Sequence, residues 1–394
     1  MTRRLLRGLV KVIVFGMVVP LLWLIEPFLR IRLTHMWSAR FGPLCFTTQT
    51  WVIRRRLEGP EKRTLRLFFG ARPANRQVWE MWKRQLPIVE STTLSAIYHW
   101  CSPELPKTRF FQPLPEEFDN HYLANQPVGL DFTIDEMSRG RALLDTMGIG
   151  PQDWYVTFQA RDPVYHQTRT DLGDSGFHHN CDIATFMAAA RHVTSLGGFA
   201  IRMGAVAERP LPETGDAHII DYAKSHRSDF GDVYLFAHTR FHLGCSTGSN
   251  FCPVLFHRPV AQANMMPLRP VPTGRNGLYN PVLIREKASG RLLSFAELET
   301  LGAYEYVDQA MCARWQYPGG MEKIGLEIVN NDANEILGLC LDMLDRLEGR
   351  PVDSEAVEIQ AWYKRRFFAH VPTIDFAPDI GPRFVLKYRH LFSG

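Results

Sequence analysis

The chain has 394 residues, of which 45% are hydrophobic and 22% charged, so it is a folded protein with room for more than one domain. A net charge of only +4 argues against a dedicated duplex nucleic-acid binder, which concentrates basic residues on one face. The seven cysteines form no CxxC pair, which argues against a zinc site or a disulfide framework and favours reduced thiols.

Residues 1–33 predict a membrane anchor. Arg3, Arg4, Arg7 and Lys11 precede an uncharged apolar run at residues 12–25, and about 20 apolar residues span a bilayer. No small-residue cleavage site follows, which argues against a signal peptide; a buried helix of a soluble domain is the remaining alternative. The segment either spans the membrane or lies in its interface. The arginines that follow it place the bulk of the chain in the cytoplasm.

Residues 34–148 predict an N-terminal Rossmann-like domain. Residues 34–60 are expected to hold its first helix, and residues 64–69 form a strand that ends at Gly70. Asn75 is expected to cap the next helix. Residues 86–89 suit a second short strand, and residues 102–128 are an irregular loop that is either an acceptor-side surface or a plain connection.

Residues 149–300 predict a second Rossmann-like domain. Short apolar runs alternate with helical segments, which is the pattern of a doubly wound parallel sheet. The expected strands lie at residues 154–158, 199–201, 219–220, 241–243 and 259–264. Residues 265–300 are rich in loops, and residues 301–394 are expected to form helices that pack back on the N-terminal domain.

Polar and glycine-rich breaks follow the predicted strands, and ligands of open α/β sheets bind at such carboxyl ends. Arg202, with Gly204 beside it, follows one strand, where a guanidinium can bind a diphosphate through parallel hydrogen bonds. Ser246, Thr247 and Gly248 follow another strand, where hydroxyls and free N–H groups suit an anion. The structural alternatives are a domain-interface salt bridge for Arg202 and an ordinary helix cap for the serine–threonine turn.

Two carboxylates and two histidines complete the candidate site. Asp221 either accepts hydrogen bonds from a ribose or base, or caps a helix. Asp162, beside Arg161, is a candidate general base or a residue that orients a sugar hydroxyl. His178 and His179 lie in the polar loop that follows and are either catalytic or structural. No GxGxxG or GxxxxGK[ST] motif is present, which argues against dehydrogenase and P-loop functions.

Four ordered segments carry a family resemblance: FQARDPVY (158–165), GGFAIRMGA (197–205), IIDYAKSHRSDFGDVYLF (219–236) and FHLGCSTGSNFCPVLFHRPVAQAN (241–264). Their R-D-x-x-Y, I-R-M-G, I-D-Y-A and S-x-G motifs resemble those of a family of bacterial glycosyltransferases, which is distantly similar to the GT-B fucosyltransferases. The segment at residues 66–89 is similar to the family's N-terminal βα unit. Residues 178–181 depart from the pattern, because the family has an arginine-bearing loop there, and the glycine turn at residues 245–249 departs as well.

The resemblance implies a GT-B-like α/β fold, with two Rossmann-like domains facing a cleft. It implies that Arg202 and residues 246–249, which include Ser249, meet the diphosphate of a nucleotide-sugar donor. Asp221 and Ser228 would shape the nucleotide pocket. It further implies no cofactor besides the donor substrate and no bound metal, and no DxD motif is present.

We therefore expect a membrane-associated glycosyltransferase of the hexosyl or deoxyhexosyl class. It would move a sugar from a nucleotide diphosphate to a lipid-linked or surface-glycan acceptor in polysaccharide biosynthesis, at the cytoplasmic face of a bacterial inner membrane. Its partners would be the nucleotide-sugar, the acceptor and the membrane surface, with no nucleic acid. One alternative is a non-catalytic, membrane-anchored partner of a glycan-assembly complex, and another is an unrelated nucleotide-dependent enzyme.

Overall fold

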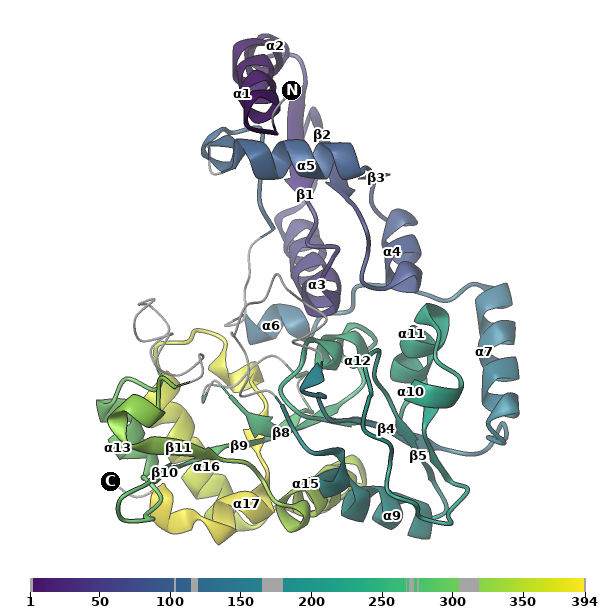
Figure 1. Cartoon of the computed structure of the whole chain (residues 1–394), viewed down its shortest axis with the longest axis vertical. Coiled ribbons are helices and arrows are strands. Elements are labelled where there is room, and N and C mark those ends of the chain that lie inside the picture. The colour runs from purple at the N-terminus through teal and green to yellow at the C-terminus, as the bar shows by residue number, and fades with distance from the viewer. Residues whose placement is uncertain are drawn as a thin grey trace. The chain divides into compact units, whose positions relative to one another are not determined.

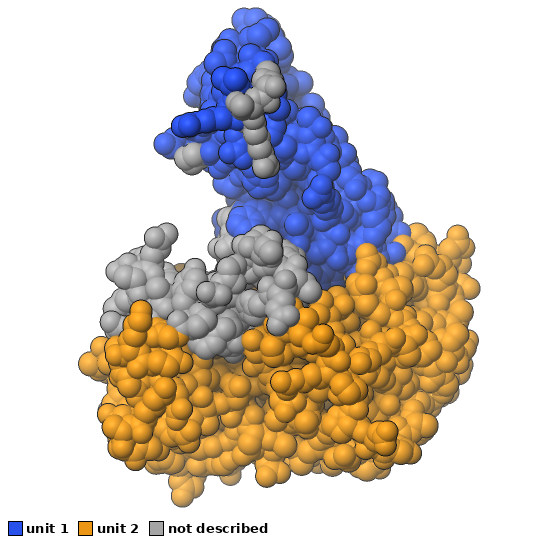
Figure 2. Space-filling view, viewed as in Figure 1, with its two compact units in different colours: residues 1–117, 126–131 blue, residues 118–125, 132–394 orange. Residues whose placement is uncertain are grey.

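The computed structural model describes residues 3–102, 104–114, 120–164, 180–266, 268, 273–274, 276–304 and 319–392. The chain divides into two compact units (Figure 2), the first comprising Met1–Glu117 and Gln126–Asp131 and the second Phe118–Asn125 and Phe132–Gly394. Each unit contains a parallel sheet with helices packed on it, which confirms the expected α/β class.

The first unit is built on a three-stranded parallel sheet in the order β1-β2-β3 (Figure 1). Its elements are α1 (Arg3–Ile13), η1 (Val14–Val18), α2 (Val19–Ile25), β1 (Arg30–His35), α3 (Phe41–Glu58), β2 (Thr64–Gly70), α4 (Arg76–Lys83), β3 (Ile88–Glu90), α5 (Thr92–Cys101) and η2 (Leu105–Lys107). The strands expected at residues 64–69 and 86–89 are confirmed as β2 and β3. No strand was expected at β1, whose arginines alternate with apolar residues directly after the predicted anchor.

Asn75 caps α4 as predicted. Its side-chain oxygen accepts a hydrogen bond from the backbone N–H of Val78 at 3.0 Å, which satisfies one of the donors that a helix start leaves open. The cap fixes the helix so that Trp79 and Trp82 are fully buried. The indole N–H of Trp82 then donates to the carbonyl of Leu44 in α3 at 2.9 Å, which joins the two helices.

The N-terminal helix runs from Arg3 to Ile25 through α1, η1 and α2. The wider η1 turn directly precedes Pro20, which has no backbone N–H to donate to the preceding turn. Within the described chain, the stretch Arg4–Ile25 is the one helix long and apolar enough to cross a membrane, with a mean hydropathy of 2.4. Its composition fits the predicted anchor.

The second unit contains a seven-stranded parallel sheet in the order β12-β9-β8-β7-β4-β5-β6 (Figure 1). Its elements are α6 (His121–Ala124), α7 (Ile134–Thr146), β4 (Tyr155–Gln159), η4 (Ile183–Phe186), α9 (Met187–Ser195), β5 (Phe199–Arg202), β6 (Ile219–Ile220), α10 (Tyr222–Ser225), α11 (Asp229–His238), β7 (His242–Gly244), η5 (Gly248–Asn250), α12 (Phe251–Leu255), β8 (Val260–Met265), β9 (Leu278–Pro281), β10 (Leu283–Glu286), α13 (Phe295–Thr300), η6 (Glu322–Ile324), β11 (Leu326–Val329), α15 (Ala333–Leu347), α16 (Ser354–Phe368), η7 (Ile374–Phe376), β12 (Asp379–Ile380), α17 (Pro382–Lys387) and η8 (Arg389–Leu391). The five strands expected between residues 154 and 264 are confirmed as β4 to β8.

Helices cover both faces of this sheet, with α10, α11 and α12 on one side and α9 and α15 on the other (Figure 1). We expected the helices after residue 301 to pack back on the N-terminal domain. Helix α15 lies in the core of the second unit instead, because its apolar side chains join the cluster that contains Ala261 of β8 and Leu278 of β9, the strands on which it packs. The α15 residues in this core are Ile336, Leu339, Cys340, Met343 and Leu344.

Helix α7 also belongs to the second unit, whereas we expected the boundary near residue 148. Gly140 in α7 lies against the ring of Tyr234 in α11, so close that a Cβ at position 140 would be 1.9 Å from the ring. Close packing of this kind needs glycine. Helix α7 therefore packs on α11 through a glycine. A glycine adds nothing to an apolar pattern, so the sequence did not predict this contact.

Candidate functional site

The strand order places the switch point of the second sheet between β4 and β7. Strands β4, β5 and β6 extend the sheet to one side, and β7, β8 and β9 extend it to the other. In doubly wound sheets, ligands bind beyond the carboxyl ends of the strands at this point. The register aligns Phe158 of β4 with Arg202 of β5 and with Leu243 of β7. Arg202 and the turn after β7 therefore lie on the same edge, about 10 Å apart at the usual strand spacing.

Arg202 is buried at the end of β5, with 3% of its surface exposed. Its Nη1 donates to Oδ2 of Asp221 at 3.0 Å, and its Nη2 donates to the carbonyl of Arg209 at 2.7 Å. A guanidinium has five N–H donors, so these two bonds leave others for a ligand. The domain-interface salt bridge that the sequence left open for Arg202 is not what these contacts show, because Asp221 and Arg209 both belong to the second unit with Arg202.

Asp221 follows β6 and occupies the N-cap position of α10, but its side chain makes no capping hydrogen bond there. One carboxylate oxygen accepts the bond from Arg202. The other, Oδ1, is buried and has no hydrogen-bond partner among the described residues. A buried carboxylate oxygen without a donor is costly, and a hydroxyl or amine of a ligand would satisfy it.

Asp162 lies directly beyond β4 and accepts three hydrogen bonds from backbone N–H groups. Its Oδ2 accepts from Glu208 at 2.9 Å and Arg209 at 3.1 Å, and its Oδ1 accepts from Val164 at 3.1 Å. Burial alone would raise the pKa of this carboxyl, but the three donors hold it below the ordinary value. Asp162 is therefore ionised at neutral pH and holds the segment that follows β5.

Arg209 links the two charged residues through its backbone, since its N–H donates to Asp162 and its carbonyl accepts from Arg202. The segment between β5 and β6 leaves the sheet at Gly204, whose φ of 148° lies in a region that favours glycine. Sequence reasoning did not select Arg209, because the groups it uses are those that every residue carries.

The turn after β7 holds the predicted hydroxyls. Ser246 is buried, and its hydroxyl donates to the carbonyl of Met266 at 2.9 Å. The hydroxyls of Thr247 and Ser249 bond to each other; both side chains are half-buried, and Gly248 between them is exposed. Ser246 thus supports the turn, whereas residues 247–249 are accessible at the edge.

Asn250 stabilises this turn from below. Its Nδ2 donates to the carbonyl of Cys245 at 2.8 Å and to Oε1 of Gln262 at 2.9 Å. Glycine at position 244 is required for this arrangement, because a Cβ there would lie 2.6 Å from Oδ1 of Asn250. The turn after β7 is therefore fixed to β8 before any ligand binds.

The remaining predicted site residues are Ser228, His178 and His179. The hydroxyl of Ser228 caps α11 by accepting from the N–H of Gly231 at 3.0 Å. His178 and His179 lie outside the described residues.

A thiol pair lies at the same edge and was not predicted. The backbone N–H of Arg161 donates to Sγ of Cys245 at 3.1 Å, and Nδ2 of Asn264 donates to Sγ of Cys181 at 2.9 Å. The hydrogen bond from Cys245 and that from Asn264 lower the pKa of the Cys181 thiol against the opposing effect of burial. Burial raises the pKa of Cys245. The scattered positions of these residues in the sequence gave no signal of this cluster.

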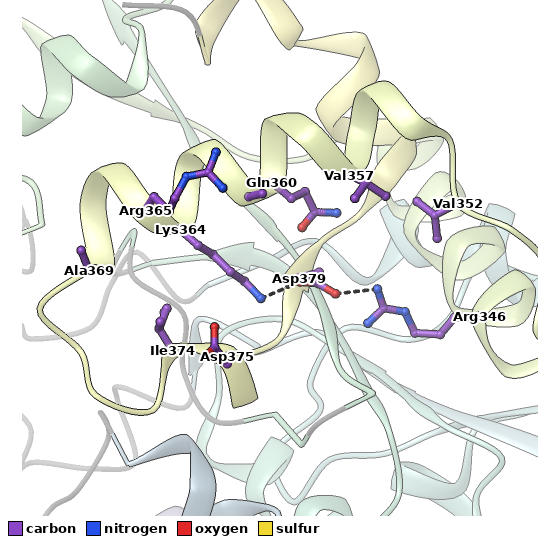
Figure 3. A pocket seen from close by; sticks show the side chains of 11 residues that line it. Arg346, Val352, Val357, Gln360, Lys364, Arg365, Ala369, Ile374, Asp375 and Asp379 are labelled. Carbon is purple, nitrogen blue, oxygen red and sulfur yellow. Dashed lines mark hydrogen bonds and ion pairs between the residues drawn. The ribbon is translucent and has the colours of Figure 1, made fainter.

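A cavity of about 400 Å³ lies elsewhere in the second unit, beside α16 and η7 (Figure 3). Among its lining residues, Asp379 accepts from Nζ of Lys364 at 2.6 Å and from Nη2 of Arg346 at 2.8 Å. Asp379 pairs with Leu278, the first residue of β9. The cavity therefore lies at the amino-terminal edge of the sheet, away from the switch point.

No protein-family model matches the chain, and no curated protein matches it. Among solved structures it is similar to a glycosyl transferase family 9 protein from Veillonella parvula DSM 2008, with 8% identity and a TM-score of 0.44 over 80% of this chain and 98% of the other. It is also similar to the ADP-heptose LPS heptosyltransferase II of E. coli, with 10% identity and a TM-score of 0.39 over 64% of this chain and 90% of the other. Both TM-scores are below 0.5, so the fold assignment rests on the strand order itself.

Proposed function

We propose that the chain is a membrane-associated glycosyltransferase that transfers a sugar from a nucleotide diphosphate to a lipid-linked or surface-glycan acceptor. The observation that carries the proposal is the switch point between β4 and β7, which has the charged residues after β4 and β5 on one side and an accessible hydroxyl turn after β7 on the other. Doubly wound sheets bind nucleotides at this point. The motifs that resemble those of bacterial glycosyltransferases narrow the ligand to a nucleotide-sugar.

In the proposed donor complex, the turn at residues 247–249 and the remaining N–H donors of Arg202 bind the diphosphate. Asp221 accepts from the ribose or base through its unsatisfied Oδ1. The acceptor hydroxyl oxygen bonds to the anomeric carbon while the bond from that carbon to the phosphate oxygen breaks. The diphosphate leaves with the electron pair, and its added negative charge is stabilised by Arg202.

A general base must accept the proton of the acceptor hydroxyl, and the predicted catalytic residues are not equally suited to that role. Asp162 is bound by three N–H donors and has a lowered pKa, which makes it a weak proton acceptor and a good positioning residue. We therefore propose that Asp162 holds the segment that carries Arg209. We propose that His178 or His179 is the base that accepts the proton of the acceptor hydroxyl.

The test is calorimetric titration of the full chain with a panel of nucleoside diphosphates and nucleotide-sugars. We expect one nucleotide series to bind, and we expect Thr247→Val combined with Ser249→Ala to weaken that binding about tenfold or more, which corresponds to about 1.4 kcal/mol. The matched control is Arg365→Ala in the cavity at the opposite edge, which should leave the affinity unchanged. The assignment fails if no member of the panel binds, or if only the control substitution reduces binding.

A second candidate function follows from one observation. Arg202, Asp162 and Ser246 are all engaged by partners within the protein, as they would be in a non-catalytic partner of a glycan-assembly complex that keeps the fold. Donor binding without release of nucleoside diphosphate, across a panel of lipid-linked acceptors, would favour this candidate. We place the protein at the cytoplasmic face of a bacterial inner membrane in either case.

A further inference from the structure

The N-terminal helix is docked along its length on the first unit. Near its start, the guanidinium of Arg7 lies 5.9 Å from the ring centroid of Trp100. Near its end, the ring of Trp23 meets Phe110 edge to face at 5.5 Å. Between these contacts, Val14 is buried with Cys101 and Leu105. From Arg7 to Trp23 the helix is about 24 Å long at about 1.5 Å per residue, so it lies against the unit rather than projecting from it.

The docked side of the helix also carries charge. Nζ of Lys11 pairs with Oε1 of Glu104 at 2.9 Å, and these side chains are 38% and 47% exposed. The guanidinium of Arg109 lies 4.1 Å from the ring centroid of Trp23. If the helix spanned a bilayer, these charged groups would be drawn toward the hydrocarbon, where a charge is strongly unfavourable. The docked side therefore needs water or lipid headgroups.

The opposite side of the helix is an apolar stripe. Its members recur every three or four residues, with one step of five across the wider η1 turn, so they share one helix face, and each is more than half exposed: Leu5, Leu9, Val12, Met17, Leu21 and Leu24. Soluble monomers rarely expose a continuous apolar surface of this length. The arginines at the start of the helix suit anionic lipid headgroups.

We infer that this helix lies in the plane of the membrane and inserts its apolar stripe into one leaflet without crossing it. A helix about 10 Å across fits the depth of about 5–10 Å that interfacial helices reach. This also explains why the helix is apolar enough to span a membrane. One of its apolar sides packs on the first unit, and the other is the stripe that faces lipid.

The inference rests on the proposed function and deepens it by favouring a lipid-carried acceptor. Tyr98 of α5 packs in the cluster with Val14 and also stacks on His35, at 4.5 Å between ring centroids. His35 is the last residue of β1, so one layer of side chains separates the membrane helix from the carboxyl end of the first sheet. Ligands of parallel sheets bind at that end. A lipid-linked acceptor could therefore keep its lipid carrier in the leaflet while its sugar reaches the carboxyl end of the first sheet.

Vesicle binding tests the mode of attachment. We expect the full chain to co-float with vesicles of phosphatidylcholine and phosphatidylglycerol, and Met17→Glu with Leu24→Glu to reduce partitioning about tenfold or more, because the stripe supplies the apolar contact. The control is Ile134→Glu, an apolar residue of α7 that is 89% exposed, which should partition like the wild type. If the stripe is instead an interface between copies of the chain, light scattering will show dimers without vesicles that the double substitution makes monomeric, and the inference fails.

Protease access distinguishes an interfacial helix from a spanning one. An epitope tag placed before Met1 should be removed by protease from membrane vesicles whose cytoplasmic face is outward, because an interfacial helix keeps its start on the same side as the folded units. Protection of the tag until detergent is added would overturn the inference. Nucleotide affinity, measured by calorimetry on the Met17→Glu and Leu24→Glu variant, should stay unchanged, so failure here and failure of the donor assignment are separate outcomes.

Discussion

Arg202 and Asp221 follow adjacent strands of the second sheet and form a 3.0 Å ion pair whose arginine is almost fully buried. We predict that Arg202→Ala lowers the free energy of unfolding by about 3 kcal/mol, since breaking a buried pair strands a charge. Urea denaturation measures the loss. Arg202→Lys should lose less because it keeps the charge beside Asp221, but it should still lose some stability because lysine cannot reach both Asp221 and the carbonyl of Arg209 in a fork. Equal losses for the two substitutions would argue against this geometry.

Asp162 should control the order of the segment between β5 and β6. In Asp162→Asn an amide NH₂ would face the N–H groups of Glu208 and Arg209, or the N–H of Val164, and leave at least one buried donor without a partner. We expect a loss of about 1–3 kcal/mol and faster amide hydrogen exchange at Glu208 and Arg209. Unchanged exchange at these two amides would show that the carboxylate does not hold the segment.

Asp232 makes stability depend on pH in an unusual direction. Burial raises the pKa of Asp232 to about 6, partly offset by Arg227, so the folded protein holds a proton that the unfolded chain releases near the ordinary aspartate pKa of 3.8. The free energy of unfolding should therefore fall by up to about 3 kcal/mol as the pH rises from about 4 to about 6, and stay level above that.

Asp232→Asn should remove this contribution, which is measured as the change in the unfolding free energy between pH 4.5 and pH 7 relative to the wild type. Asp229→Asn is the matched control, because Asp229 pairs with the same Arg227 at 3.0 Å but is 36% exposed. The same slope in the Asp232 variant as in the wild type would refute the assignment.

Two helix glycines should respond oppositely to alanine. Gly140→Ala in α7 places a Cβ 1.9 Å from the Tyr234 ring and should cost about 1–3 kcal/mol through overpacking. Gly338→Ala in α15 meets only the side chain of Arg383 at 3.8 Å and should stabilise the protein by about 0.5–1 kcal/mol. Melting temperatures of the two variants compare the effects directly. A neutral Gly140→Ala would show that α7 does not pack closely on α11.

Sugar transfer should survive removal of divalent cations. The motif resemblance implies that side chains offset the charge of the leaving diphosphate, and Arg202 is the candidate for this role. We expect release of nucleoside diphosphate to continue at a similar rate after dialysis against EDTA. A loss that added magnesium restores would contradict this expectation.

Strands β4 to β8 of the second sheet could be predicted because each is a short apolar run that ends at a polar or glycine-rich break, as at Ile219–Ile220. Strand β1 was missed because its arginines alternate with apolar residues beside an anchor, and Arg32 owes its place to a two-fold bond with Glu26 at 2.8 and 2.9 Å. Strands β9 and β12 were missed because each is short and depends on a partner distant in the chain.

The edge that carries the candidate site could be predicted, since it follows from the order of strand ends. The partners of its side chains could not. Asp162 is held by backbone N–H groups of Glu208 and Arg209, and Asn250 reaches under its turn only because residue 244 lacks a Cβ. Such contacts depend on where the backbone passes, which the pattern of side chains does not encode.

The contact between Val14 and α5 has a consequence for anyone preparing this protein. Removing the N-terminal helix to purify the protein without detergent would expose Cys101 and Leu105 to water. It would also remove Lys11, the ion-pair partner of Glu104. Variants that lack the helix should therefore aggregate. Full-length protein with glutamate at positions 17 and 24 should remain soluble, because these substitutions alter only the apolar stripe and leave the contact with α5 intact. The N-terminal helix therefore also covers part of the apolar core of the first unit.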